Sequence, residues 1–485
     1  MRKVKVRTLY LIAIIVGGLV GLATKSTYAM FTASAEIDNP ICMSANLTSE
    51  EETIETMEVV VTAGEKKTVP VTINNTSTNT VGYSVWYTSP SDKVKIGIKL
   101  SNSDSSNSTG TISSNGSKKV YVQIINNSSS SVTITLGVIS NKTSNDMTLI
   151  PNTELDFSVN LVTYIKNLYT NATKTTTTVN SVTYNLAPSE GLMNDRKGSM
   201  STGIDAGNIR YYGANPNNYI YFNCSDYSNQ SSDTCETWRI IGVFDGKVKI
   251  MRGSVIGSYS WDSSADSINS GYGVNEWSQA DLMKLLNGGY ETETVGGSLY
   301  WNAKSGTCYN DSKNATTACN FTSTGLKNDT TRNMIAETTY YTRGHNDNSI
   351  YVDAMYDKER VSGTVITGVT PTRTLTCTGK IAIPYPSDYG YAADLSLCQQ
   401  QLSSYSDATC TANNWMKEIV APNYGWLLTP SSGSADSAWG VYSSGDVYRY
   451  NAYNAFGVAP VLSMTSDLGI VAGTGTSSDP YQLYV

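Results

Sequence analysis

Short segments in which apolar and polar residues alternate recur throughout residues 30–162. In residues 94–100, for example, Val94, Ile96 and Ile98 point to one side while Lys95 and Lys99 point to the other. Polar runs rich in Asn, Ser and Thr, such as residues 74–79, separate these segments and indicate turns. Six or seven short strands in about 130 residues predict an antiparallel β-sandwich. The expected strands are residues 59–61, 69–73, 81–87, 94–100, 120–124 and 132–138.

Residues 163–190 are rich in Thr and Asn, and residues 175–178 are an unbroken threonine run. A polar stretch of low complexity between two patterned regions is typical of a linker. The sequence therefore predicts that residues 163–190 connect two domains.

Residues 191–485 have a different composition, because seven of the eight tryptophans and seven of the eight cysteines lie there. Residues 238–252 predict a hairpin that turns at Asp245-Gly246. Residues 278–287 predict a short helix with Ser278 as its N-cap and Gly288 as its terminator. Strands and helices mixed in this way predict an α+β domain, and an α+β fold class for the whole chain. Further helices are expected at residues 327–338 and 350–361, and strands at 426–429, 438–443, 447–451 and 457–464.

The first 29 residues have the three parts of a secretory signal peptide: a basic start, an apolar stretch and a cleavage site with small residues at Thr27 and Ala29. The apolar stretch, residues 9–23, is shorter than the roughly 20 residues of a spanning helix. An uncleaved N-terminal anchor is the alternative, and it would be the only membrane contact of the protein. With either alternative, residues 30 onward are expected to be extracellular or at the cell surface.

Six cysteines fall into three pairs, each spaced 11 or 12 residues apart around a polar loop. In an exported chain this spacing favours three local disulfides. Zinc binding would need CxxC-type spacing, which is absent. Cys42 and Cys377 are left over, and the sequence leaves open whether they pair. The expected disulfides are Cys224–Cys235, Cys308–Cys319 and Cys398–Cys410.

Several function classes are disfavoured. The chain has one histidine, His345, so a multi-histidine zinc site is impossible and a Ser-His-Asp triad would have to use that residue. We interpret it as a loop histidine. A net charge of −7 without a basic patch makes nucleic acid an unexpected partner. Ser387-Asp388 is a common dipeptide, and residues 385–391 are expected to form a turn in the core. No catalytic residue, metal or cofactor is predicted.

Four separated motifs give the second region a resemblance to known proteins. They are residues 208–219 (Asn-Ile-Arg-Tyr-Tyr-Gly-Ala-Asn-Pro-Asn-Asn-Tyr), 238–243 (Trp-Arg-Ile-Ile-Gly-Val), 385–392 (Tyr-Pro-Ser-Asp-Tyr-Gly-Tyr-Ala) and 457–462 (Gly-Val-Ala-Pro-Val-Leu) with 473–476. In these motifs the chain resembles exported bacterial surface proteins whose C-terminal part has a C-type-lectin-like fold, including the variable proteins of diversity-generating retroelements. The resemblance covers about residues 190–485. The preceding region is more weakly similar to camelysin/TasA-like sandwiches, from residues 28–32 onward.

The chain also departs from its relatives. Ala459 stands where the variable proteins usually have an arginine. The tripeptides that supply calcium ligands for sugar binding are absent, and the cysteines do not form the redox-active pair of formylglycine-generating enzymes. An enzyme is therefore not expected.

In the variable proteins a solvent-facing patch precedes the closing motif, and residues 439–456 are equivalent here. This stretch is rich in Tyr and Asn, which provide contact area and adaptable hydrogen bonds at small rotamer cost. Val441, Val447, Val458 and Val461 are expected to face the core. The alternative is that the tyrosines only cover a sheet. The predicted ligand-binding residues are Trp439, Tyr442, Ser444, Asp446, Tyr448, Tyr450, Asn451, Tyr453, Asn454 and Phe456.

The resulting hypothesis is a secreted or surface-displayed binding protein. Its lectin-like domain would recognise a protein or carbohydrate of another cell or a phage, and the resemblance implies diversification by a retroelement. The alternative is a structural surface-layer or filament protein that self-assembles through its N-terminal sandwich.

Overall fold

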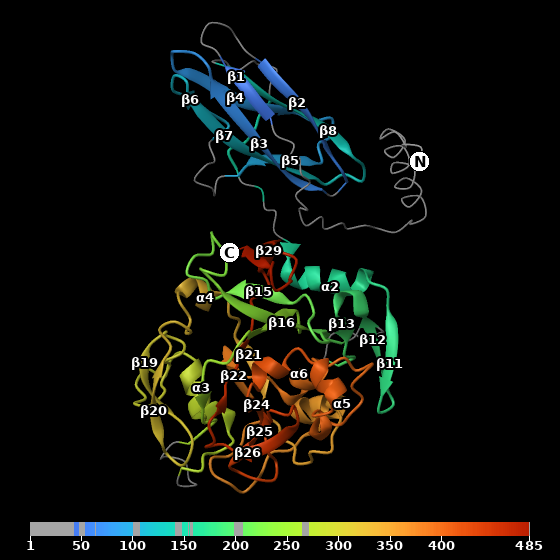
Figure 1. Ribbon diagram of the computed structural model, residues 1–485, viewed down its shortest axis with the longest axis vertical. Helices are drawn as coiled ribbons and strands as arrows, with labels where there is room; N and C mark the ends of the chain where they lie inside the picture. Colours follow the sequence, from blue (N-terminus) through green and yellow to red (C-terminus); the bar gives the residue numbers. More distant parts are fainter. Residues whose placement is uncertain are drawn as a thin grey trace, which may run out of the picture. The chain divides into compact units, whose positions relative to one another are not determined.

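The computed structural model describes residues 43–47, 54–63, 65–99, 107–140, 148–153, 155, 159–197, 207–263 and 271–484. The expected signal peptide and Cys42 lie outside these residues. The chain divides into two compact units, residues 1–157 and 158–485 (Figure 1). Within the described residues, no helix is both long enough and apolar enough to cross a membrane.

The first unit contains two facing sheets with a shared apolar core, as predicted. One sheet has the strand order β1-β3-β7-β5 and the other β2-β8-β4-β6, with β9 beside β4. One pair, β1 with β3, is parallel, which differs from the expected antiparallel sandwich. Because β2 belongs to the other sheet, no tight turn joins β1 to β3, so an antiparallel pairing is not imposed. The strands are β1 (Met43–Leu47), β2 (Ile54–Val61), β3 (Lys66–Asn75), β4 (Val81–Thr88), β5 (Val94–Ile98), β6 (Thr109–Ile112), β7 (Ser117–Asn126), β8 (Val132–Ser140) and β9 (Thr148–Leu149).

The predicted linker at residues 163–190 is wrong, because this stretch is folded into the second unit. It begins in helix α2 (Leu161–Asn171), whose side chains Leu161, Tyr164, Ile165 and Tyr169 are buried at helical spacing. The threonine run forms strand β11 (Thr175–Val179), which pairs with β12 (Val182–Ala187). Threonine is β-branched and therefore suits a strand as well as a polar loop.

A nine-stranded sheet is the centre of the second unit, in the order β11-β12-β13-β14-β16-β17-β28-β23 with β15 beside β16. The predicted hairpin is confirmed as β16 and β17, which turn at Asp245-Gly246. Ile240 and Ile250 belong to one apolar core, and Ile241 and Met251 belong to another. The strands not yet given are β13 (Leu192–Asn194), β14 (Ile209–Tyr211), β15 (Tyr219–Phe222), β16 (Glu236–Phe244), β17 (Lys247–Arg252), β23 (Ile381–Ala382) and β28 (Val461–Ser463).

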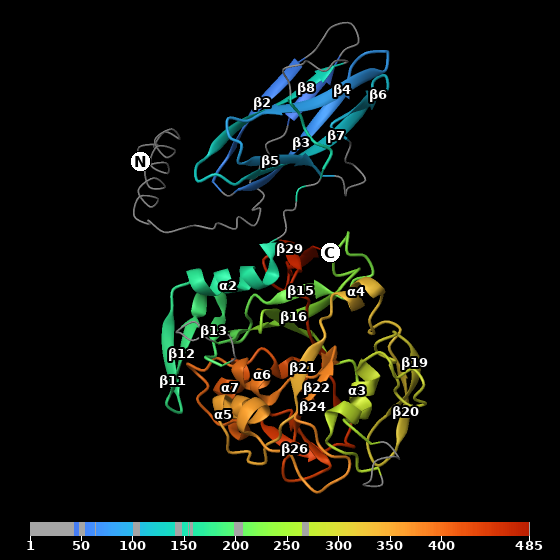
Figure 2. The same cartoon turned by 180° about the vertical axis from the view of Figure 1, so that it is seen from behind.

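A second sheet, in the order β18-β27-β24-β25-β26, carries most of the predicted site. Its edge strand β26 lies at the end of the second unit opposite α2 and β29 in both views (Figures 1 and 2). The predicted strand 457–464 is two strands, β27 and β28, and Pro460 lies between them without a backbone N–H to donate. The strands are β18 (Ser258–Tyr259), β24 (Gly425–Pro430), β25 (Ser437–Val441), β26 (Val447–Asn451) and β27 (Phe456–Gly457).

The helices at residues 278–287 and 327–338 are shorter than predicted, whereas the helix predicted at 350–361 is confirmed, because α5 continues into a π-helical turn and the two cover residues 352–362. Ser278 lies in a 3₁₀ turn (Trp277–Gln279), and the N-cap of the following helix α3 is Ala280, so the predicted cap is wrong. The α-helices after α2 are α3 (Asp281–Leu286), α4 (Asp329–Asn333), α5 (Val352–Asp357), α6 (Pro386–Tyr391), α7 (Ala408–Ala412) and α8 (Lys417–Val420), together with a π-helical turn (Lys358–Ser362) and 3₁₀ turns (Pro188–Glu190 and Leu402–Ser404).

The remaining strands form three small sheets. One contains β10 (Val159–Asn160), β29 (Gly469–Ala472) and β30 (Gln482–Tyr484), and the other two are the pairs β19 (Ser305–Tyr309) with β20 (Thr316–Asn320) and β21 (Thr338–Tyr341) with β22 (Thr376–Gly379).

Short helices and several sheets make the chain a β-rich α+β protein, in agreement with the predicted class.

Candidate functional site

Four tyrosines, Tyr424, Tyr442, Tyr448 and Tyr450, come together on one face of the second sheet, and we call them the tyrosine cluster. The ring of Tyr442 lies 5.2 Å from Tyr424, 5.8 Å from Tyr448 and 5.2 Å from Tyr450, centroid to centroid. Two of these contacts are edge to face, the geometry that aromatic pairs prefer. Tyr424 is 39% exposed and the other three are half-buried, so the cluster is open to solvent.

The alternation of strand β26 explains the arrangement. Tyr448 and Tyr450 are two residues apart and therefore point to the same side of the sheet. Their partners on the neighbouring strand β25 are small: Gly440 lies opposite Tyr448, and Ala438 lies opposite Tyr450. A side chain at Gly440 would bring its Cβ within 3.2 Å of the Tyr450 ring. The glycine thus provides the space in which the ring lies.

Phe456 forms the floor of the tyrosine cluster. Its ring stacks on Tyr424 at 5.0 Å and meets Tyr450 edge on at 4.8 Å, and it is 8% exposed. It is therefore a supporting residue, and its prediction as a ligand contact is wrong. Burial raises the pKa of Tyr450 well above its ordinary value, so the hydroxyl stays neutral.

The turn between β25 and β26 is held by several hydrogen bonds. Tyr442 donates its N–H to the Asp446 carbonyl at 2.8 Å, and Gly445 donates back to the Tyr442 carbonyl at 2.8 Å. Gly445 has φ +105°, which favours glycine. The Tyr389 hydroxyl donates to the Gly445 carbonyl at 2.9 Å, and Ser406 donates its N–H to Asp446 Oδ1 at 2.7 Å. Ser444 is exposed at the tip of this turn.

Asn451, the last residue of β26, forms a separate group with Tyr453 and Asn454, which follow the strand. Asn451 is exposed, and its amide donates to the Tyr453 hydroxyl at 3.3 Å. The Tyr453 ring packs against Tyr272 at 5.6 Å, and Lys313 lies over Tyr272. The predicted residues thus divide between the tyrosine cluster and this second group.

Trp439 is fully buried, so its prediction as a ligand contact is wrong. On β25 it alternates with Gly440 and points away from the tyrosine cluster. Its indole N–H donates to the His345 carbonyl at 3.1 Å, and the two rings lie parallel at 6.4 Å. Val441, Val447, Val458 and Val461 face the core as predicted.

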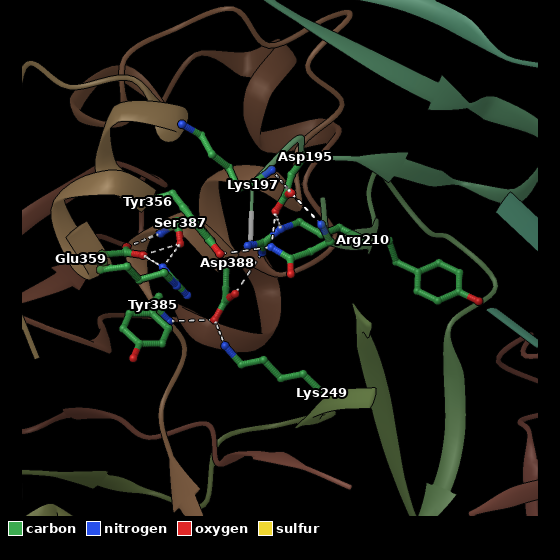
Figure 3. A network of polar contacts seen from close by, with 12 residues as sticks. Asp195, Lys197, Arg210, Lys249, Tyr356, Glu359, Tyr385, Ser387 and Asp388 are labelled. Carbon is green, nitrogen blue, oxygen red and sulfur yellow. Dashed lines mark hydrogen bonds and ion pairs between the residues drawn. The ribbon is translucent and has the colours of Figure 1, made fainter. Parts of the chain in front are cut away.

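A buried network of charges lies behind the turn and centres on helix α6 (Figure 3). Asp388 accepts from Arg210 Nη1 at 3.0 Å, from Lys249 Nζ and from the Tyr385 N–H at 3.0 Å. Arg210 also pairs with Asp195. A second carboxylate, Glu359, pairs with Arg360 and accepts from the N–H and hydroxyl of Ser387. These groups join strands β14 and β17 to helix α6.

The pKa values of two members of the network, Asp388 and Lys249, are both lowered, but for different reasons. Burial favours the neutral acid, yet the cations of Lys249 and Arg210 outweigh it and hold the pKa of Asp388 at about 2. Burial lowers the pKa of Lys249 to about 8 despite the neighbouring Asp388. Three carboxylates and three cations balance, and the residues of the 385–392 motif are buried. The network therefore positions α6, whose Tyr389 holds the turn of the tyrosine cluster.

The three predicted disulfides are confirmed: Cys224–Cys235, Cys308–Cys319 and Cys398–Cys410. The last one closes the loop whose Ser406 binds Asp446. Cys377 is half-buried and forms no disulfide with another described cysteine, and Cys42 lies outside the described residues. The described residues contain no group of three or more His, Cys, Asp or Glu side chains placed to hold a metal ion.

Sequence reasoning missed Tyr424, Lys249 and Glu359. Tyr424 lies 18 residues before Tyr442, and the antiparallel pairing of β24 with β25, in which Gly425 lies opposite Val441, brings it to the cluster. Lys249 alternates with apolar residues in β17, which is the pattern of a solvent-facing lysine. The contacts of these three residues could not be predicted from their spacing in the sequence.

Comparison with known proteins gives no family. No protein-family model and no curated protein matches the chain. Among solved structures it is similar to PliG, a periplasmic inhibitor of g-type lysozyme from Aeromonas hydrophila, with 10% identity, a TM-score of 0.13, and coverage of 21% of this chain and 99% of that one. A TM-score this low carries no argument about fold or function.

Proposed function

We propose that this chain is an exported binding protein whose second unit is a C-type-lectin-like domain that recognises a protein ligand through the tyrosine cluster. The observation that carries the proposal is the gathering of four partly exposed tyrosines on one face of a sheet, around a turn fixed by hydrogen bonds. Tyrosine is enriched at protein interfaces because it combines apolar area with a polar tip.

The chemistry of the turn supports a protein ligand. Its residues Ser443, Ser444, Gly445 and Asp446 lie beside the tyrosines, and Tyr, Ser, Gly and Asn are also the residue types that antibody paratopes prefer. The hydrogen bonds to Gly445 and Asp446 order the turn before binding, which reduces the entropy lost on association.

Ring packing favours a protein over a carbohydrate. Stacking on a sugar needs a free ring face, and Tyr442 already packs against three other tyrosines. Tyr424 likewise stacks on Phe456. This packing reduces the ring area that is free to stack on a sugar, whereas partly exposed tyrosines are typical of protein interfaces.

The three disulfides support export, because disulfides persist in oxidising compartments outside the cytosol. The basic and apolar pattern of residues 1–29 is the second support. Sequencing the N-terminus of the secreted protein tests this part. We expect it to begin at Met30.

The binding site is tested by photo-crosslinking followed by an affinity measurement. A photoreactive amino acid at position 448 should crosslink a specific surface protein when the chain is applied to intact cells. With that protein purified, the double variant Tyr442→Ala/Tyr448→Ala should bind at least ~10-fold more weakly, as expected for aromatic interface residues.

Tyr484→Ala is the matched control, since Tyr484 is 49% exposed on strand β30, which pairs with β29 at the end of the unit opposite β26 (Figure 1). Equal affinities of the double variant and this control would exclude the tyrosine cluster as the site. A glycan array on which the wild type binds and the double variant does not, without any crosslinked protein, would change the ligand class to carbohydrate.

The resemblance to retroelement variable proteins adds a proposal at the level of the gene. If a retroelement diversifies residues 442–456, an imperfect repeat of their coding sequence lies nearby in the genome, and the variable codons align with adenines of that repeat. Sequencing the locus in several isolates tests this. Variation spread evenly over residues 191–485 would exclude diversification while leaving the binding site unaffected.

A further inference from the structure

A second site is indicated by a pocket of about 370 Å³ on the central sheet, separate from the tyrosine cluster. Strands β15, β16 and β17 and helix α8 supply its walls. The volume falls within the range of roughly 300–1,000 Å³ that small-molecule sites occupy. Its lining includes two arginines, one glutamate, three side chains with a hydroxyl group and an apolar side chain: Tyr219, Glu236, Thr237, Arg239, Arg252, Ser254 and Ile419.

One of the two arginines is neutralised. Arg252 Nε lies 2.9 Å from Glu236 Oε2, and Arg252 Nη2 lies 3.3 Å from Glu236 Oε1, so the pair is bidentate. Arg252 Nη1 donates to the carbonyl and hydroxyl of Ser254. Glu236 also accepts from the Trp238 indole. Both carboxylate oxygens of Glu236 therefore already accept hydrogen bonds, from Arg252 and Trp238.

The other arginine has only neutral partners. Arg239 is 6% exposed and donates from Nε to Asn218, and from Nη2 to Asn215 Oδ1 at 3.4 Å and to the Pro216 carbonyl at 3.4 Å. Its guanidinium lies 3.6 Å from the Tyr219 ring centroid. Within the described part of the chain, Arg239 forms no ion pair, and its Nη1 forms no hydrogen bond.

A buried cation without a counter-charge is costly, and proteins normally pair it. Burial lowers the pKa of Arg239 to about 10, which still leaves it cationic at neutral pH. The asparagines and the tyrosine ring hold the guanidinium in one orientation. They leave Nη1 as its remaining donor, in a side chain that lines an open pocket.

We propose that this pocket binds a singly charged oxyanion, the carboxylate or sulfate ester of a small molecule or sugar, through Arg239. The net charge of the two arginines and Glu236 is +1, which a monoanion neutralises and a phosphate dianion would exceed. Thr237 and Ser254 offer hydroxyl groups to the rest of the ligand, and Ile419 offers an apolar wall. This site goes beyond the proposed function, because it uses none of the residues of the tyrosine cluster.

Isothermal titration of the full chain at constant ionic strength tests the proposal with named probes. The carboxylates are glucuronate and N-acetylneuraminate, the sulfate ester is galactose 6-sulfate, the dianion is inorganic phosphate, and neutral glucose is the blank. We expect binding of a carboxylate or of the sulfate ester with a Kd on the order of 1 mM or tighter, as for a small ligand held by one charge-assisted contact. Which of the two binds identifies the source of the anion.

Thr237→Glu is the most informative variant, because Thr237 is exposed on β16 at the wall of the pocket. The new carboxylate should occupy the place of the anion and reduce the affinity at least ~10-fold. Thr316→Glu makes the same change at an exposed residue of strand β20 and is the matched control, for which we expect wild-type affinity.

Arg239→Met should abolish anion binding if the variant folds. If it does not fold, the comparison of Thr237→Glu with Thr316→Glu tests the site. The proposal is overturned if no anion binds better than glucose, if phosphate binds more tightly than the monoanions, or if Thr237→Glu and Thr316→Glu bind equally. The variant Tyr442→Ala/Tyr448→Ala should bind the anion like the wild type, so failure of one site is distinguishable from failure of the other.

Discussion

Two buried carboxyl groups, those of Asp262 and Asp281, interact directly and share hydrogen bonds with the same backbone segments. Asp281 donates its N–H to Asp262 Oδ1 at 3.1 Å, and Ser263 donates its N–H to Asp281 Oδ2 at 2.8 Å. Burial and the neighbouring Asp262 raise the pKa of Asp281 to about 8, and burial raises the pKa of Asp262. At neutral pH the folded protein therefore holds a proton on this pair that the unfolded chain releases.

The substitution Asp281→Asn should flatten the pH dependence of stability. An aspartate pKa raised in the folded state stabilises the fold fully below the unfolded pKa, near 4, and this contribution is lost as pH rises through the folded pKa, near 8. The free energy of unfolding of the wild type should fall by on the order of 1 kcal/mol per pH unit more than that of the variant between pH 5 and 8. Urea unfolding at four pH values measures both slopes, with the exposed Asp311→Asn as control. Parallel curves for wild type and Asp281→Asn would refute the shared proton.

Asp388 shows the opposite behaviour, because Lys249 and Arg210 stabilise its charged form. Replacing it by asparagine leaves two buried cations short of a counter-charge, so Asp388→Asn should lower the free energy of unfolding by about 3–5 kcal/mol. Asp357→Asn breaks the more exposed pair with Lys197 and should cost less than about 1 kcal/mol. Guanidinium unfolding at pH 7 compares the two. Because the pKa of Asp388 is lowered to about 2, its contribution is present above pH 4 and lost as pH falls toward 2.

Among the elements, the loop closed by Cys398 and Cys410 connects a covalent bond to the candidate site. Removing the disulfide with Cys398→Ala/Cys410→Ala should destabilise the protein by about 3 kcal/mol, the entropy expected for a loop of this length. Ser406 lies in this loop and holds Asp446, so the amides of residues 442–447 should exchange faster with solvent. Hydrogen exchange read by mass spectrometry measures this. Cys224→Ala/Cys235→Ala opens a loop of similar length and should leave residues 442–447 unchanged.

Secondary-structure elements and disulfides could be predicted where residues close together in the sequence determine them. The hairpin of residues 238–252 and the three disulfides follow from a turn dipeptide and from cysteine spacing. Strand β26 was predicted with its true bounds and with Val447 facing the core, but the two faces of β25 were not separated. Trp439 and Tyr448 were expected to share one surface, but residue parity places Trp439 opposite Arg449 and Tyr448 opposite Gly440. The helices at residues 278–287 and 327–338 were predicted too long, because long-range contacts rather than propensity end these short helices, whereas the helical segment at 352–362 was predicted nearly in full.

At the scale of the whole molecule, the sequence identified two regions but misplaced the boundary. Composition alone made residues 163–190 resemble a linker, whereas their apolar residues are spaced to fit a core that lies far away in the sequence. Ile165 packs in the same core as Leu468 and Leu483, and β10 pairs with β29. The fold of the second unit therefore depends on residues that precede the predicted boundary by about 30 positions.

A chain beginning at Ser158 should fold alone, and one beginning at Gly191 should not. The shorter chain lacks the buried side chains of α2 and β12, and each fully buried aliphatic residue contributes about 1.5–3 kcal/mol. Losing Leu161, Ile165 and Leu186 alone approaches the total stability of a typical domain, about 5–15 kcal/mol. We expect residues 158–485 to melt cooperatively at the temperature of the matching transition of the full chain. We expect residues 191–485 to be insoluble or to melt without a transition, as followed by circular dichroism. A cooperative transition of the shorter chain at the same temperature would show that residues 158–190 are dispensable and restore them as a linker.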